Sequence, residues 1–234
     1  LAGHSPPPGA NSVFRSWLDA YGDLSMVEEP IPRWLAANAA EVEASFVFKA
    51  WLDADGDPGL VEEPVQHWLA GHREEPKAAY VLRGWLDAGG SIRIVRDFVL
   101  EYVERHPLSE SAVHLYSAWL DAGGSPAPVR DGLLEWMKVH VSSPGARIVV
   151  THVARLADLP PESIRDLLAW CVHFPAEDEA LPTLVRLGGS LRSPDLADDA
   201  LTACEAVLPV SCFAARVVAP RLRVPICGLF LHLI

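Results

Sequence analysis

The sequence has little cysteine, little basic charge and no long apolar run. Its 4 cysteines in 234 residues are too few for a small scaffold held together by disulfides. Its 19 Lys and Arg residues are outnumbered by 31 Asp and Glu residues, for a net charge of −12. This balance argues against a nucleic-acid binder, which needs a basic stripe for the phosphate backbone. No apolar run approaches the ~20 residues that a membrane-spanning helix needs.

Motifs for catalysis and metal binding are missing as well. The chain has no Gly-x-x-x-x-Gly-Lys-Ser/Thr phosphate loop, no Gly-x-Ser-x-Gly and no His-Glu-x-x-His. Without a Cys-x-x-Cys pair, buried thiols are the expected state of Cys171, Cys204, Cys212 and Cys227. We therefore expect no catalysis, no cofactor and no metal. Because no secretory signal opens the chain, we expect a cytoplasmic protein that does not bind membranes.

The main positive feature is a repeat. The tetrapeptide Trp-Leu-Asp-Ala begins at residues 17, 51, 85 and 119, with an equal step between successive copies. The same register holds Val27, Val61, Val95 and Val129, the aromatic residues Trp34, Trp68, Tyr102 and Trp136, and the alanines at 10, 44, 78, 112, 146, 180 and 214. The later repeats have diverged, but the alanines continue. The sequence thus predicts one array over residues 1–218, with six repeats and a partial seventh.

The two ends of the chain depart from this pattern. Leu1–His4 repeats the sequence of Leu69–His72, so the chain starts in the middle of a repeat. Natural arrays usually begin with a polar cap, and we therefore expect a fragment of a larger protein. Residues 219–234 form a divergent, apolar C-terminal tail. The tail is expected to cover the last repeat or to mediate self-association.

Each repeat predicts two helices, here called helix A and helix B. In the second repeat, residues 43–54 place Val47, Phe48 and Trp51 on one apolar stripe, at the spacing of an amphipathic helix. A turn follows over residues 55–59, and helix B runs from about Val61 to His72. Isolated helices of about 12 residues are marginal in water. Successive pairs must therefore stack, which predicts an all-α fold of the α-solenoid type.

A helix-turn-helix unit of about 34 residues resembles the tetratricopeptide repeat. Gly56-Asp57 falls where that family often has Gly-Asp between its helices, and Phe48 falls on a family hydrophobic position. Lys49 and Val61 depart from the family, which has small residues there. A HEAT-like repeat is the nearest alternative. The Trp-Leu-Asp-Ala pattern also looks like repeat arrays of large bacterial signalling and defence proteins. The tetratricopeptide resemblance implies a right-handed superhelix whose concave face is lined by the A helices.

Two sets of residues on helix A are the candidate binding site. The first is a row of carboxylates near the end of each helix A, formed by Asp19, Asp53, Asp87 and Asp121. Their position is unfavourable for the helix dipole. They are expected to have a structural role, in which each caps the following helix or pairs with an Arg or His of a neighbouring repeat, or else to bind a basic peptide. The second set is Phe46 with its equivalents Ser12, Tyr80 and His114, which vary between repeats while core positions stay constant.

The other repeated aromatic and histidine residues favour structural roles. The tryptophans at 17, 51, 85 and 119 lie on the apolar stripe and are expected in the core. His72, His106 and His140 each end a helix B, as Asn38 does, where they can satisfy terminal carbonyl groups. Their spacing is not that of metal ligands.

The predicted function is recognition without chemistry. We expect a protein- or peptide-binding repeat scaffold or sensor module of a larger protein, whose partner is a basic protein or peptide. Residues 1–80 hold 13 acidic and 5 basic side chains, which favours such a partner. Two alternatives stay open. One is a purely structural spacer or oligomerisation element. The other is a non-catalytic subunit of a helical-repeat enzyme, comparable to prenyltransferase α-subunits.

Overall fold

The computed structural model describes residues 10–20, 22–188 and 196–218, with side chains up to residue 209. Within these ranges every regular element is a helix and no strand occurs, which confirms the all-α prediction. The chain divides into two compact units, Leu1–Val129 and Arg130–Ile234. Each unit is described separately below. The C-terminal tail at 219–234 and Leu1–His4 lie outside the described residues.

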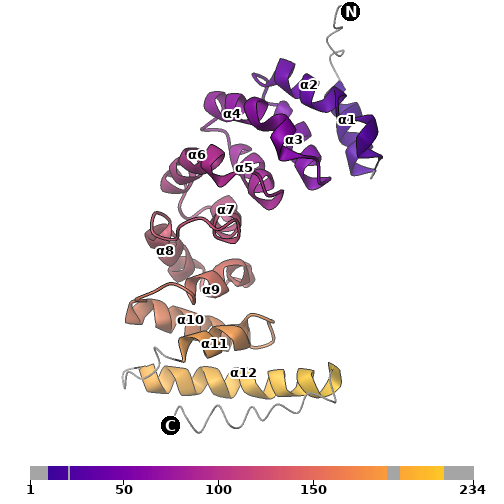
Figure 1. Cartoon of the computed structure of the whole chain (residues 1–234). Helices are drawn as coiled ribbons and strands as arrows, with labels where there is room; N and C mark the ends of the chain where they lie inside the picture. Colours follow the sequence, from indigo (N-terminus) through magenta and orange to yellow (C-terminus); the bar gives the residue numbers. More distant parts are fainter. Residues whose placement is uncertain (1–9, 21, 189–195, 219–234) are drawn as a thin grey trace, which may run out of the picture. The chain divides into compact units, whose positions relative to one another are not determined.

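The first unit contains alternating A and B helices. Its A helices are α1 (Ala10–Asp19), α3 (Ala44–Asp53), α5 (Ala78–Asp87) and α7 (Glu110–Asp121), and its B helices are α2 (Pro30–Asn38), α4 (Glu62–Gly71) and α6 (Ile92–Arg105). Two short 3-10 turns, η1 (Leu24–Met26) and η2 (Pro58–Val61), precede α2 and α4. Each A helix packs on the next one, and α4 packs on both α2 and α6 (Figure 1). Neighbouring repeats are thus in contact through helices of the same kind.

The end of each helix A explains why Trp-Leu-Asp-Ala is followed by glycine. In the second, third and fourth repeats the residue after Ala is left-handed: Asp55, Gly89 and Gly123 have φ values of 59°, 75° and 84°. The next residue is Gly56, Gly90 or Gly124, and its N–H donates back to the Trp carbonyl, at 2.9, 2.9 and 2.8 Å. These bonds close the helix as a Schellman-type cap.

The tryptophan side chain then holds the turn. Trp85 Nε1 donates to the carbonyl of Ser91 at 3.1 Å, and Trp51 and Trp119 do the same to Asp57 and Ser125. The indole ring lies directly over the second glycine, so a Cβ built on Gly90 would be 2.4 Å from the ring. The glycine is therefore required by a close approach of the ring, and the two residues recur as a pair.

Most positions of the predicted register are buried. The core contains the register valines, the register alanines from Ala10 to Ala180, and seven of the eight tryptophans. The exception is Trp17, which is partly exposed. Two helix B ends of this unit match the prediction: His72 Nδ1 lies 2.9 Å from the Trp68 carbonyl oxygen, and Asn38 Nδ2 donates to the Trp34 carbonyl at 2.8 Å.

The second unit keeps the register less regularly. It contains α8 (Arg130–His140), η3 (Pro144–Ala146), α9 (Arg147–Val153), α10 (Pro161–His173), α11 (Ala180–Leu187) and α12 (Ala197–Val218). Within it α10 packs on α8, α11 and α12. Helix α12 spans both the sixth helix B and the segment expected to start a seventh helix A. It continues without a break through Pro209.

One buried hydroxyl in the second unit gives a stability prediction. Thr183 is fully buried, and its Oγ1 has no hydrogen-bond partner among the described residues. The equivalent residues Val47, Val81, Leu115 and Val149 are all aliphatic and fully buried. Because an unsatisfied buried hydroxyl is costly, Thr183→Val should raise the free energy of unfolding by about 1 kcal/mol. Urea denaturation measures this change, with Thr202→Val, an exposed site, as control. A destabilised Thr183→Val chain would contradict the placement of this hydroxyl.

Candidate functional site

The residues that vary between repeats lie together on the exposed side of the A helices. Phe46 on α3 and Tyr80 on α5 are 41% and 51% exposed. Ser12 on α1 is exposed and His114 on α7 is half-buried. We call these four residues the variable row. The residue after Phe46, Tyr80 and His114 is fully buried in the core in each case, so the variable row is one helical step from the core.

The carboxylate ladder lies along the same helices, and each aspartate has a partner on its own helix. Arg15 Nε lies 3.4 Å from Asp19 Oδ2, Arg83 Nε lies 3.1 Å from Asp87 Oδ2, and Lys49 pairs with Asp53. Ser117 Oγ donates to Asp121 at 3.1 Å. Each of these partners is one turn earlier on the same helix. These contacts lie within single helices, while the charge of Asp87 also acts on His114 of the next repeat.

The capping role belongs to other residues. Asp23 and Asp57, four residues after the ladder positions, accept hydrogen bonds from the backbone N–H of Ser25 and Gly59 at 2.9 and 2.8 Å. The hydrogen bonds at Ser25 hold the pKa of Asp23 below its usual value. The sequence does carry a signal for the observed pairing, because a basic residue stands four positions before three of the four ladder aspartates.

The exposed ion pairs of the ladder should contribute little to stability. The side chains of Lys49, Asp53, Arg83 and Asp87 are each about half exposed, and exposed pairs contribute about 0.2–1 kcal/mol. We expect the double variant Asp53→Asn/Asp87→Asn to lower the free energy of unfolding by about 1 kcal/mol or less. Thermal denaturation at low and high salt measures this effect. A loss of several kcal/mol would show that the ladder is structural.

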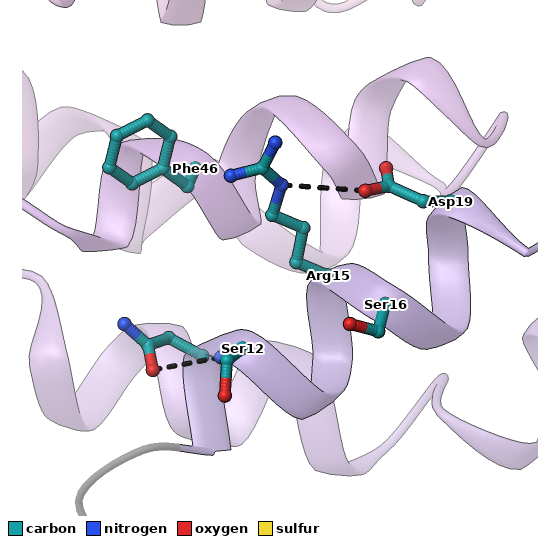
Figure 2. Close-up of a pocket in the computed structure, with 6 residues that line it drawn as sticks. Ser12, Arg15, Ser16, Asp19 and Phe46 are labelled. Atoms are coloured by element: carbon teal, nitrogen blue, oxygen red, sulfur yellow. Dashed lines mark hydrogen bonds and ion pairs between the residues drawn. The ribbon is translucent and has the colours of Figure 1, made fainter.

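Phe46 is flanked by cations from both neighbouring repeats. Lys77 Nζ lies 4.5 Å from the centre of the Phe46 ring, and Arg15 Cζ lies 5.5 Å from it. Cations at this distance are attracted by the ring. Figure 2 shows the Arg15 guanidinium between the Phe46 ring and the Asp19 carboxylate. Sequence reasoning did not identify Arg15 as a site residue, because its contact with Phe46 joins two different repeats.

Two hollows open along the variable row at corresponding places. One, of about 410 Å³, lies between α1 and α3 and is lined by Asn11, Ser12, Arg15, Ser16, Asp19 and Phe46 (Figure 2). The other, of about 160 Å³, lies between α5 and α7 and is lined by Ala79, Tyr80, Arg83, Glu110, Ser111 and His114. Arg15 and Arg83 occupy the same repeat position. The two hollows are thus the same inter-helix site, two repeats apart.

The surroundings of His114 favour its uncharged form. Partial burial lowers the pKa of its imidazole, and the nearby Arg83 guanidinium lowers it further. Near neutral pH the ring therefore offers one donor and one acceptor nitrogen. Together with Tyr80, Ser111 and Glu110, it gives the second hollow a polar lining suited to hydrogen bonds from a ligand.

The remaining candidate chemistry is buried or dispersed. Cys171 is fully buried, its thiol donates to the Ala180 carbonyl at 3.6 Å, and burial raises the pKa of that thiol to about 12. The side chains of Cys212 and Cys227 lie outside the described part of the chain. Among the described residues, no three His, Cys, Asp or Glu side chains cluster in a way that could hold a metal ion. In the same ranges, no helix is both long and apolar enough to cross a bilayer.

Comparison with family models, with curated proteins and with solved structures finds no match to this chain.

Proposed function

We propose that this chain is a cytoplasmic scaffold that binds a protein or peptide along the exposed side of its A helices. In this proposal it is a module of a larger protein, in keeping with the resemblance to bacterial signalling and defence arrays. Its A and B helices form a right-handed α-solenoid of tetratricopeptide-like repeats, and it performs recognition without catalysis of its own.

The packing of the first unit supports the solenoid. Successive A helices contact each other, and successive B helices contact each other. Residues at equivalent positions of the repeat recur on both kinds of helix. Contacts between A helices are more extensive than those between B helices. Helices on the inner side of a curved stack lie closer together, so this difference agrees with the family expectation that A helices line the concave face.

One observation carries the binding proposal: exposed aromatic rings in the variable row stand beside hollows. Phe46 and Tyr80 are large apolar side chains with 41% and 51% exposure, and the folded core does not use them. Exposed aromatic residues that lie together mark interaction surfaces. The residues that differ between repeats lie on helices whose buried residues are nearly the same in every repeat. This pattern is expected when different repeats contact different parts of a ligand.

The net charge of residues 1–80 favours a basic ligand. Residues 1–80 carry 13 acidic and 5 basic side chains, so long-range attraction draws cations to this half of the chain. At Phe46 the guanidinium of Arg15 lies beside the aromatic ring and also pairs with the carboxylate of Asp19. A ligand arginine would replace Arg15 at both, gaining a cation–π contact and an ion pair with Asp19.

Panning of a displayed peptide library against the chain tests this proposal. We expect selection of Arg- or Lys-rich peptides, whose affinity falls at least tenfold, about 1.4 kcal/mol, in Phe46→Ser/Tyr80→Ser. The variant should fold normally because both side chains are exposed. Leu60→Ser/Val139→Ser, which alters two equally exposed apolar residues elsewhere, is the matched control. Equal affinity for both double variants, or selection of no peptide, would favour the spacer role instead.

A further inference from the structure

Tyr80 and Phe46 are equivalent residues of the variable row, but they differ in the side chain that the next repeat brings to the ring. At Phe46 this side chain is Lys77, whose Nζ lies 4.5 Å from the centre of the ring. The residue that takes the place of Lys77 one repeat later is Ser111. Ser111 lines the same hollow as Tyr80, whose side chain is 51% exposed. The position from which Lys77 reaches Phe46 thus holds an uncharged side chain at Tyr80.

The hollow between α5 and α7 also contains a carboxylate that the two preceding repeats lack. Glu110 is an exposed residue in the first turn of α7, and its equivalents one and two repeats earlier are Pro76 and Val42. Glu110 and Tyr80 line the hollow together. An aromatic ring attracts a cation over its face, and a carboxylate pairs with a cation through charge-assisted hydrogen bonds. This hollow therefore presents both groups that hold a lysine or arginine side chain.

His114 lies in the same hollow, one turn after Glu110 on α7. It lines the hollow together with Arg83 of α5, whose Nε lies 3.1 Å from Asp87 Oδ2. The charges that act on His114 are those of Arg83 and Asp87 on α5 and of Glu110 on its own helix. None comes from α6, all of which the structure describes and which packs on α7 as well. While His114 is neutral these groups are one cation and two carboxylates, and its protonation adds a second cation.

The charge of His114 changes only in acid. Partial burial lowers the pKa of its imidazole, and the neighbouring Arg83 lowers it further. The hollow therefore has an excess of negative charge at neutral pH and loses that excess as the pH falls through the pKa of His114. At the position of His114 the two preceding repeats have Tyr80 and Phe46, which stay uncharged throughout this pH range. Within the variable row from Phe46 to His114, such a change of charge is thus confined to the hollow between α5 and α7.

We propose that the hollow between α5 and α7 binds a lysine or arginine side chain of the ligand, on Glu110 and beside Tyr80, and that protonation of His114 releases it. This inference rests on the proposed function, because it assigns a second contact of the same basic ligand. The bound cation disfavours the imidazolium form of His114. By linkage, that form weakens the binding of the cation by the same factor. The affinity for a basic peptide should therefore fall as the pH is lowered.

Fluorescence anisotropy with a fluorescein-labelled hexa-arginine peptide tests the release by acid on the full chain, in about 0.15 M salt to suppress long-range attraction. We expect an affinity about tenfold lower at about pH 5 than at about pH 7.5. His114→Gln, which cannot be protonated in this range, should lose most of this difference. His67→Gln, which changes an exposed histidine of α4, should retain it. Nuclear magnetic resonance titration of the His114 imidazole should show a lower pKa with the peptide bound.

Ser111→Lys tests the cation site itself. This variant would bring to Tyr80 the cation that Lys77 brings to Phe46, and that cation would compete with the ligand. We expect about fivefold weaker binding of the peptide at neutral pH. Ser142→Lys, which adds the same charge at an exposed serine elsewhere, should change the affinity little. Circular dichroism of both variants checks that the helices are intact.

The possible failures separate this inference from the proposed function. A pH dependence that persists in His114→Gln would overturn the release by acid, and binding unchanged by Ser111→Lys would overturn the cation site. Either result would leave the proposed function standing if Phe46→Ser/Tyr80→Ser still weakens the binding. Absence of saturable binding at every pH would contradict both the cation site and the recognition of basic ligands.

Discussion

Replacing Trp85 with alanine is expected to lower the free energy of unfolding by about 3–5 kcal/mol, as for other large buried aromatic residues. Trp85 is 1% exposed, and its Nε1 donates to the Ser91 carbonyl at 3.1 Å. The substitution opens a cavity between repeats and removes the bond that fixes the turn after α5. Chemical denaturation followed by circular dichroism measures the loss.

The same substitution at Trp17 provides a matched control. Trp17 occupies the same repeat position and donates to the Asp23 carbonyl at 3.3 Å, but its ring is 41% exposed. The substitution at Trp17 removes less buried apolar surface and leaves no closed cavity. Trp17→Ala should therefore lower the free energy of unfolding clearly less than Trp85→Ala does. Equal losses would contradict the conclusion that the interior tryptophans are buried and that Trp17 is partly exposed.

The second large effect is expected at Gly90. A Cβ at this residue would lie 2.4 Å from Cε2 of Trp85, much closer than van der Waals contact allows. Gly90→Ala should therefore displace the buried indole ring and lower the free energy of unfolding by about 2–3 kcal/mol, in the range of overpacked cores. Denaturation and the near-ultraviolet circular dichroism of tryptophan both report this change.

Gly71 is the control for the loss of glycine itself. It ends α4, and a Cβ there would meet nothing within 4 Å. Gly71→Ala should be neutral or slightly stabilising, because alanine loses less conformational freedom on folding. If Gly90→Ala were equally harmless, the pairing of tryptophan with glycine would not be the reason that both recur in successive repeats.

The regular part of this fold could be predicted because each repeat uses the same residues to form the same packing contacts and the same helix end. Trp51 and its equivalents recur with the glycine five residues later, and the distance between them is fixed by one helix end. Turn residues such as Asp57 and Pro58 also report directly on local backbone geometry. Periodicity therefore located helices A and B of the second repeat to within a few residues of their observed ends.

The contacts of the candidate site were harder to predict because they join side chains across repeats or depend on rotamers. The ladder aspartates were expected to interact beyond their own helix, yet Lys49 and Arg83 meet them one turn away. The cations around Phe46 come from α1 and from the residue before α5. The exposure of Trp17 likewise could not be predicted from its local sequence, which matches that of Trp51.

The most direct test of the binding face is photo-cross-linking. A basic peptide selected by panning would carry a photoreactive group, and mass spectrometry would locate its cross-links on the full chain. Binding along the variable row predicts cross-links on α1, α3, α5 and α7, near Phe46 and Tyr80, and their loss in Phe46→Ser/Tyr80→Ser. Cross-links concentrated on α2, α4 and α6, or unchanged by the double variant, would contradict recognition by the exposed side of the A helices.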